Sequence, residues 1–325
     1  MKTLAASLTL ATALAVMPQM AGAQDYPTQP ITIVVPFTAG GPTDTVTRLV
    51  AQAMSADLGQ QIVVENVGGA GGTLGAGRVA QAQPDGYTLL LHHIGMATSA
   101  TLYRELPFNA LEDFEYVGLV TEVPMVMVGR PDLEAETLED VINFVREGGE
   151  DVMYANAGIG AASHLCGLLF MEAIDTQMTT IPYQGTGPAV TDLMGGQVDL
   201  MCDQTTNTTP QINEGSIKAF AVTVPERVES LPDVPTGAEA GIDGFEVSIW
   251  HGVYAPKGTP EEIVQRLSQS LQVALADETV IARFGDLGTV PSPAEDATPE
   301  ALQAKVQSEI DLWRPIIEAA GVYAN

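Results

Sequence analysis

The architecture of this chain follows from the stretch Val34-Val35-Pro36-Phe37-Thr38-Ala39-Gly40-Gly41-Pro42-Thr43-Asp44. Residues 31–35 form a β-branched run that predicts a buried strand. After the glycines, apolar residues recur with the spacing of an amphipathic helix, at Val46, Leu49, Val50, Ala53, Met54 and Leu58. A strand, a glycine turn and a helix start leave backbone N–H groups free to bind a small anion. The same residues also fit an ordinary strand-to-helix turn, because no phosphate-binding glycine motif is present.

The combination of strand, small-residue loop and helix start occurs again further along the chain. Strand 151–155 runs into loop 156–164, and a third copy spans 180–188. Six glycines in residues 68–77 allow one backbone to approach another backbone or a ligand closely. Strands and helices alternate, so we expect an α/β fold with mainly parallel strands. Such sheets bind ligands beyond the carboxyl ends of their strands, where these loops would lie together.

Hydroxyl residues mark three helix starts, at Thr137, Thr259-Pro260 and Thr298-Pro299. In the last two, proline follows the cap at the first helical position. Strand 197–203 is expected to run into a polar loop over residues 204–207. Residues 115–128 predict a strand region interrupted by Pro124, and 245–254 an extended stretch. We expect the final helices to pack on the first unit, so that the chain crosses twice between two domains and forms a hinge. The predicted domains are 24–123 with 250–325, and 124–249.

The N-terminus and the charge restrict where the protein works. Residues 1–23 hold one charge, Lys2, followed by a short apolar run and the motif Ala21-Gly22-Ala23. This pattern predicts a signal peptide cleaved after Ala23 and an exported, periplasmic protein. The formal charge of −28 argues against nucleic acid as a partner. Any anionic ligand must therefore be held by local donors and not by the overall field.

The two cysteines leave three alternatives open. Cys166 and Cys202 form a disulfide in an oxidising compartment, remain as two buried thiols, or contribute to a metal site. His92, His93 and His164 have no recognised metal-ligand spacing with each other or with Cys166. We therefore expect no metal and no cofactor.

Several linked motifs resemble one known family. These motifs include Val35-Pro36-Phe37 with Gly40-Gly41 and Asp44, Val64-Glu65-Asn66, and Pro84-Asp85-Gly86-Tyr87-Thr88. The likeness continues through Tyr183-Gln184-Gly185-Thr186-Gly187-Pro188, Gly196-Gln197-Val198-Asp199 and Ala255-Pro256 with Gly258-Thr259-Pro260. Together they resemble the substrate-binding proteins of tripartite tricarboxylate transporters, the TctC or Bug family. The resemblance covers essentially all of the mature chain. It implies a type II-like periplasmic-binding-protein fold that closes two domains on a small carboxylate.

The resemblance also implies where the ligand is bound. One carboxylate would be held by backbone amides and ordered waters from two loops, Phe37-Thr38-Ala39-Gly40-Gly41-Pro42-Thr43-Asp44 and Gly158-Ile159-Gly160-Ala161-Ala162-Ser163-His164. His93, Gln184, Thr186, Asp203 and Gln204 would contact the other end of the ligand. The expected ligand-binding residues are Phe37, Thr38, Ala39, Gly40, Gly41, Asp44, His93, Gly160, Ala161, Ala162, Ser163, His164, Gln184, Thr186 and Asp203.

Three of these expectations have a simpler structural interpretation. Asp44 is an acceptor near a helix start, so it is suited to ordering the loop and not to neutralising a carboxylate. Ser163 and His164 are adjacent at a helix start and point in different directions, so they do not suggest a nucleophile and its base. His92 and His93 alternate faces along a strand, and we expect His93 to face the ligand.

The function we predict is a monomeric periplasmic receptor, not an enzyme. It binds a small organic carboxylate (a di- or tricarboxylate, or an aromatic carboxylate) by hinge closure and delivers it to the membrane permease subunits of a tripartite tricarboxylate transporter. One alternative is an exported hydrolase or isomerase acting on a carboxylate. Another is a carboxylate sensor for a membrane signalling partner.

Overall fold

The computed structural model describes residues 26–321, 323 and 324, so the predicted signal peptide lies outside the described residues. Within them, ten strands form one sheet in the order β2-β1-β3-β9-β4-β7-β5-β6, and β8 and β10 both pair with β4. The strands are β1 (Ile31–Val35), β2 (Ile62–Asn66), β3 (Thr88–His93), β4 (Phe114–Gly129), β5 (Met153–Asn156), β6 (Thr179–Pro182), β7 (Leu200–Gln204), β8 (Lys218–Val222), β9 (Ser248–Pro256) and β10 (Val290–Pro291).

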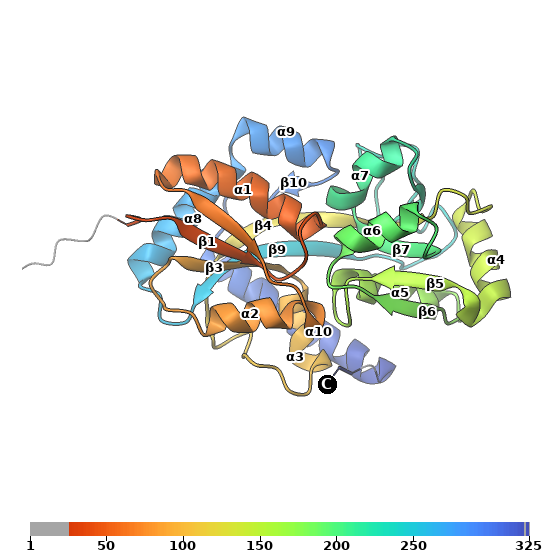
Figure 1. The fold of residues 1–325 in the computed structure, drawn as a ribbon, viewed down its shortest axis with the longest axis horizontal. Coiled ribbons are helices and arrows are strands. Elements are labelled where there is room, and N and C mark those ends of the chain that lie inside the picture. Colours follow the sequence, from red (N-terminus) through yellow and green to blue (C-terminus); the bar gives the residue numbers. More distant parts are fainter. Residues whose placement is uncertain (1–25, 322, 325) are drawn as a thin grey trace, which may run out of the picture.

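Helices cover the sheet on both faces (Figure 1). They are α1 (Pro42–Leu58), α2 (Thr73–Ala80), α3 (Gly95–Leu102), α4 (Leu138–Gly148), α5 (Ala162–Ala173), α6 (Thr186–Met194), α7 (Thr205–Asn213), α8 (Glu261–Leu275), α9 (Glu278–Asp286) and α10 (Pro299–Ala320), with short 3-10 turns at η1 (Ala70–Gly72) and η2 (Gly149–Asp151). None of the described helices combines the length and the apolar character needed to cross a membrane.

The long strand β4 divides the molecule into two lobes. Its first part, up to Pro124, pairs with β9, and from Met125 onward it pairs with β7 and β8. We call the part built on β1, β2, β3, β9 and β10 lobe 1, and the part built on β5, β6, β7 and β8 lobe 2. Figure 1 shows β4 and β9 running side by side from one lobe toward the other. Pro124 does not interrupt β4, because it stands where the strand changes partners and a missing N–H is tolerated.

The prediction of mainly parallel strands is wrong at the centre of the sheet. β1 pairs in parallel with β2 and β3, and β5 pairs in parallel with β6 and β7. The pairs β3–β9, β4–β9, β4–β7 and β4–β8 are antiparallel. The reason is topological: β4 carries the chain into lobe 2 and β9 brings it back beside β4, so the two strands run in opposite directions.

Apolar burial supports both lobes. The inner faces of β1 and β3 pack with Val46, Val50 and Met54 of α1 and with α8, as the spacing of apolar residues predicted. A second cluster continues from lobe 1 into lobe 2 and includes Phe114, Tyr154, Phe170 and Trp250. In lobe 2, Val126 and Val128 of β4 pack against helix α6 and β8. These clusters hold the strand ends, and therefore the loops that follow them, in place.

Two of the three predicted hydroxyl caps are confirmed. Thr137 and Thr298 accept hydrogen bonds from the N–H groups of Asp140 and Ala301, and α10 has Pro299 at its first position. The predicted cap at Thr259 is wrong, because its hydroxyl donates to Pro256 O and α8 begins only at Glu261. Helix α9, which the sequence did not predict, begins at Glu278 and is capped by Asp277, whose side chain accepts from Thr279 N and Val280 N.

The predicted polar loop over residues 204–207 is also wrong. Gln204 ends β7, and helix α7 begins directly at Thr205. The sequence of α7 is rich in Thr and Asn and contains Pro210, so its residues disfavour a helix and its packing against α1 and β4 decides its structure.

Candidate functional site

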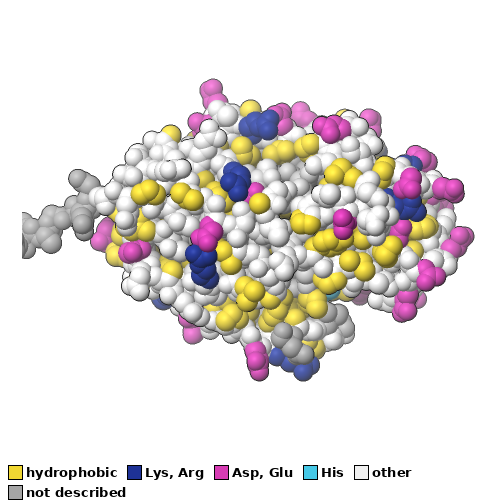
Figure 2. Space-filling model, in the orientation of Figure 1, with side chains coloured by type: hydrophobic (Ala, Val, Ile, Leu, Met, Phe, Trp, Pro, Cys, Tyr) yellow, Lys and Arg dark blue, Asp and Glu magenta, His cyan; other side chains and the backbone are white. Residues whose placement is uncertain are grey.

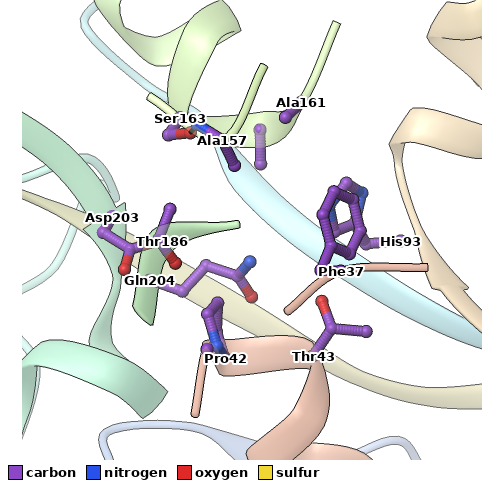
Figure 3. A pocket seen from close by; sticks show the side chains of 12 residues that line it. Phe37, Pro42, Thr43, His93, Ala157, Ala161, Ser163, Thr186, Asp203 and Gln204 are labelled. Atoms are coloured by element: carbon purple, nitrogen blue, oxygen red, sulfur yellow. Dashed lines mark hydrogen bonds between the residues drawn. The ribbon is translucent and has the colours of Figure 1, made fainter. Parts of the chain in front are cut away.

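A cavity lies between the two lobes, where the carboxyl ends of β1 and β5–β7 meet the starts of α1, α5, α6 and α7. The volume of this cavity is only about 10 Å³. This is room for roughly one water molecule, so the lobes are closed over the site and must open to admit a larger ligand. Figure 3 shows Phe37 and His93 on one side of the cavity and Thr186 and Asp203 on the other. The lining residues are Phe37, Gly41, Pro42, Thr43, His93, Ala157, Ala161, Ala162, Ser163, Thr186, Asp203 and Gln204.

Three helices from both lobes present uncapped N-termini to this cavity. The N-cap residues of α1, α5 and α6 are Gly41, Ala161 and Gly185, and no side-chain hydrogen bond caps any of the three helices. The first N–H groups of a helix have no acceptor within the helix, and its dipole makes this end partially positive. A Cβ on Gly41 would lie 3.8 Å from Thr186 N and 3.6 Å from Gly187 N, so the starts of α1 and α6 almost touch. The cavity is therefore suited to an anion.

Close backbone contacts join the lobes around the cavity. Thr38 N donates to Gln184 O (3.1 Å), and Tyr103 Oη donates to Ile159 O (2.9 Å). A side chain on Gly71 would overlap Ile159 O, and one on Gly187 would lie 2.9 Å from Ala39 O. The glycine run noted in the sequence thus brings one lobe into contact with the other.

Asp44 braces the first-lobe loop and does not line the cavity. Its carboxylate accepts from Gly40 N (3.0 Å), Arg48 Nε (2.9 Å) and Asn66 Nδ2 (3.0 Å). Burial alone would raise the pKa of Asp44, but the hydrogen bonds from Arg48, Gly40 and Asn66 hold it below its ordinary value. Asp44 therefore stays ionised and fixes the turn that places Gly41 and Thr43 at the cavity.

The second-lobe loop is fixed in a similar way. Ser163 Oγ accepts from Ala157 N (2.8 Å), which leaves the hydroxyl proton of Ser163 free for a ligand. Tyr154 Oη donates to Ser163 O (2.6 Å) and accepts from Cys202 N (3.1 Å). A disulfide joins Cys166 of α5 to Cys202 of β7, with the two Cα atoms 6.1 Å apart. Among the alternatives left open by the sequence, the structure has the disulfide.

Three buried histidines lie behind Phe37. The rings of Phe37 and His93 are stacked with centroids 4.7 Å apart, and His251 approaches His93 edge-on at 5.9 Å. Burial lowers the pKa of His93 to about 3, so its ring is neutral at pH 7. His93 Nδ1 accepts from Gly95 N (2.9 Å), which leaves the ring proton on Nε2 as a donor. The pKa of His92 and of His251 is also lowered by burial.

Two acceptors stand at the end of β7. Asp203 is 1% exposed, and Asn207 Nδ2 donates to its Oδ2 (2.5 Å). Burial raises the pKa of Asp203 to about 6, against the hydrogen bonds from Asn207, the Gln204 backbone and Thr186. Neighbouring Gln204 is also 1% exposed, and its Oε1 has no partner among the described residues. The described lining contains neither lysine nor arginine, so no cationic side chain balances Asp203.

The structure brings together about half of the residues that the sequence analysis expected at the ligand. Those that line the cavity are Phe37, Gly41, His93, Ala161, Ala162, Ser163, Thr186 and Asp203. The others lie in the same loops but face away from it or join the lobes: Thr38, Ala39, Gly40, Asp44, Gly160, His164 and Gln184.

Four lining residues were not singled out as ligand-binding or were given only a secondary role. Pro42, Thr43 and Ala157 stand next to predicted residues, at a helix start and at a strand end, where the loop positions alone could have indicated them. Gln204 was expected to contact the distal end of the ligand. His251 was missed, and no local signal marks it, because it reaches His93 only through the pairing of β9 with β3.

Comparison with known proteins gives consistent results over most of the chain. The profile of the TctC family, described as Tripartite tricarboxylate transporter family receptor, matches residues 46–322. A curated relative from Agrobacterium vitis, the UPF0065 protein in the TAR-I ttuE-ttuC' intergenic region, is 54% identical over 307 residues. The match covers 94% of this chain and 89% of the relative.

Two solved structures share the fold. The periplasmic binding protein BugD has a TM-score of 0.90 and 50% identity, covering 92% of this chain and 100% of that one. The malate-bound MatC protein of Rhodopseudomonas palustris has a TM-score of 0.87 and 41% identity, covering 90% of this chain and 100% of that one. These likenesses confirm the predicted two-lobed fold of a periplasmic binding protein.

Proposed function

As the sequence predicted, the chain belongs to the receptor family of tripartite tricarboxylate transporters and is a solute-binding protein for a small carboxylate, and we propose that its ligand is a dicarboxylate of about four carbons. The observation that carries this proposal is the meeting of three uncapped helix N-termini, from both lobes, at one cavity without lysine or arginine. Backbone N–H groups and helix dipoles favour a carboxylate there without a counter-charge. MatC, which has 41% identity, is described with bound malate, a dicarboxylate of this size.

Individual donors fit the two ends of such a ligand. Thr186 N and Gly187 N lie beside Gly41, so one carboxylate can span the starts of α1 and α6. The Ser163 hydroxyl proton and the Nε2–H of His93 remain free in the same cavity. Both are uncharged donors. They suit a carboxylate that is held by directed hydrogen bonds and not by the net charge of the protein, which is strongly acidic. On the face shown in Figure 2, acidic side chains lie toward the outer edges and basic ones are few.

Binding proceeds by closure of the two lobes. We place the domain boundaries in β4 at residues 123 and 124 and at the start of β9 at 249 and 250, where β4 changes strand partners. In the closed state, hydrogen bonds such as Thr38 N to Gln184 O join the lobes. A ligand that contacts both lobes stabilises this state by its additional affinity for it.

The ligand leaves the cavity chemically unchanged in this proposal. Ser163 Oγ accepts from Ala157 N, and His164 Nδ1 accepts from Gly160 N (3.3 Å), so each is held by its own loop. They do not form the hydrogen-bonded nucleophile and base that acyl transfer needs. The alternative of an exported hydrolase or isomerase therefore lacks a matching pair at this site.

The family assigns the protein to the periplasm and to a membrane transporter. We propose that residues 1–23 are removed after Ala23 and that the mature protein works as a monomer. It then delivers its ligand to the permease subunits of a tripartite tricarboxylate transporter, without nucleic acid as a partner. Mass spectrometry of the exported protein tests the cleavage site, and light scattering tests the monomer.

A thermal-shift and calorimetry screen tests the ligand class. We expect dicarboxylates of about four carbons to raise the melting temperature of residues 24–325 in proportion to the logarithm of their concentration. The diamide of the best ligand serves as control, because it keeps the shape but has no carboxylate. Failure of every carboxylate to bind, or equal binding of the diamide, would overturn the proposal. Conversion of the ligand during incubation, followed by mass spectrometry, would favour the enzyme alternative.

A further inference from the structure

The end of β7 carries two buried acceptors that a carboxylate ligand does not use. Asp203 and Gln204 are each 1% exposed and both line the cavity. Gln204 Oε1 is buried without a hydrogen-bond partner among the described residues. Figure 3 shows the amide end of Gln204 reaching into the space between the labelled side chains, with Asp203 on the same side next to Thr186. A buried acceptor without a donor costs free energy, so a ligand that supplies a donor would bind with an advantage.

The charge on Asp203 further favours a ligand that carries a hydrogen-bond donor. Its carboxyl accepts from Asn207 Nδ2, the Gln204 backbone and Thr186, but the described cavity lining offers no lysine or arginine to neutralise its charge. Burial raises the pKa of Asp203 to about 6, so the group is mostly ionised at pH 7.5. A purely anionic ligand beside it would meet a like charge in a poorly hydrated space. A hydroxyl or an ammonium on the ligand turns the same carboxylate into a favourable partner.

We propose that Asp203 and Gln204 accept hydrogen bonds from a hydroxyl or ammonium group on the carbon skeleton of the ligand. The ligand is then a 2-hydroxy or 2-amino dicarboxylate and not an unsubstituted one. The helix starts of α1, α5 and α6 hold the carboxylates, and the end of β7 selects the substituent. This inference rests on the proposed function, because it assumes that the cavity binds a dicarboxylate.

A ranking of three ligands of equal length tests the inference. Calorimetry at pH 7.5 compares malate, aspartate and succinate, which differ only in a hydroxyl, an ammonium or a hydrogen. We expect malate or aspartate to bind at least about tenfold more tightly than succinate, since hydrogen bonds to a charged group contribute that much or more. Equal affinity for all three, or a preference for succinate, would overturn the inference but leave the proposed function standing. No binding of any dicarboxylate would overturn the proposed function itself.

Substitution of Asp203 assigns the effect to this residue. Asp203→Asn keeps the size and an acceptor for Asn207 but removes the charge. We expect it to weaken binding of the preferred substituted ligand about tenfold or more and to leave succinate unchanged or slightly tighter. A larger loss for aspartate than for malate identifies an ammonium as the partner, and a larger loss for malate identifies a hydroxyl. An unchanged ranking in the variant would overturn the role of Asp203.

Two further variants separate recognition from folding. Asp199→Asn removes a half-buried carboxylate near the start of the same strand, where Asp199 pairs with Arg130 (2.9 Å) away from the cavity. It should lower the melting temperature and leave the ligand ranking unchanged. Gln204→Met keeps the length of the side chain but removes the unpartnered oxygen, and we expect it to narrow the preference over succinate several-fold. The melting temperature of each unliganded variant checks that it folds, and a change of ranking in Asp199→Asn equal to that in Asp203→Asn would contradict the inference.

Discussion

Helices α1 and α10 both begin with proline, but the first N–H groups of the two helices differ in whether a side chain of the same loop accepts from them. Both have proline at the first helical position, Pro42 in α1 and Pro299 in α10. In α10 the preceding Thr298 accepts a hydrogen bond from Ala301 N, whereas in α1 the preceding residue is Gly41, which has no side chain to accept one. Helix α10 therefore satisfies its first turn by itself, and α1 leaves its first N–H groups to a partner from outside.

The start of α3 is intermediate between a helix start capped by its own side chain and one without a cap. The first N–H group of α3, at Gly95, donates to Nδ1 of neutral His93, whose ring lines the cavity. At the cavity, α1, α5 and α6 begin without a side-chain cap and α3 uses a neutral ring, whereas α4, α9 and α10 are capped by side chains of their own. An anion is thus attracted to the cavity by donors that the fold leaves unpaired. Four changes test this difference between the helix starts, in order of decreasing expected effect.

Gly41→Asp should have the largest effect, because it gives α1 the acceptor that α10 already has. The backbone of Gly41 has φ −89°, which any residue adopts, and a Cβ there meets Thr186 Oγ1 at an ordinary 3.5 Å. The new carboxylate would occupy the place of the ligand and repel it, so we expect affinity to fall at least about a hundredfold. The unfolding free energy should rise by roughly 0.3 kcal/mol. Calorimetry and urea unfolding measure the two effects.

Gly41→Ala is the control for that change. It adds a methyl group in the same position without an acceptor or a charge, so its effect on affinity should be far smaller. Equal losses in the two variants would mean that space, and not the unpaired donors, governs binding at this helix start.

Acid should weaken the helix start that relies on His93. The pKa of His93 is lowered by burial to about 3 in the folded protein and is about 6.5 when unfolded, so the unfolded chain binds the proton more readily. The stability that neutral His93 contributes is present above pH 6.5 and is lost as the pH falls toward 3. Between pH 7 and pH 5 we expect a loss of about 2 kcal/mol from this residue.

The variant His93→Asn isolates that contribution. It keeps an acceptor for Gly95 but does not titrate, so its unfolding free energy should fall by about 2 kcal/mol less than that of the wild type over the same pH range. The other buried histidines are present in both proteins and cancel in the difference. Parallel curves for the two proteins in urea unfolding at several pH values would contradict the prediction.

Gly71→Ala should hold the lobes apart without changing the helix starts at the cavity. The new Cβ in lobe 1 would overlap Ile159 O of lobe 2. The φ of +60° at this position adds a backbone cost of about 1 kcal/mol. We expect about tenfold weaker binding and a larger radius of gyration with ligand, measured by X-ray scattering. Gly59→Ala is the matched control: Gly59 has φ +68° and open space around it, so it should lose stability but not affinity.

Thr298→Ala should have the smallest effect and complete the comparison. It removes the cap of α10 and should lower the unfolding free energy by about 1 kcal/mol, with affinity unchanged. Thr298→Ser, which keeps the hydroxyl, should restore most of that loss. A change in affinity on removal of this cap would show that the two helix starts are not independent.

Most local elements of the fold could be predicted from the sequence. The strands and glycine loops of the cavity and the starts of α1, α5 and α6 were predictable, because hydrophobic periodicity and capping act over a few residues. The apolar spacing of α1, the caps at Thr137 and Thr298, the family and the two loops at the cavity follow from such patterns. The misread segments, Thr259 and residues 204–207, are places where local preference and tertiary packing disagree.

Which of these local elements meet depends on how the whole chain packs. The starts of α1 and α6 are more than 140 residues apart in the chain, and the approach of Gly41 to Thr186 depends on how the lobes pack. Likewise, His251 comes to His93 only by pairing of β9 with β3, and the disulfide of Cys202 depends on α5 packing against β7. The direction in which a loop side chain points also depends on the tertiary structure. Asp44 faces its own loop, whereas Ser163 lines the cavity. Long-range contacts of this kind leave no local periodicity to read, so the cavity emerges only when the whole chain has packed.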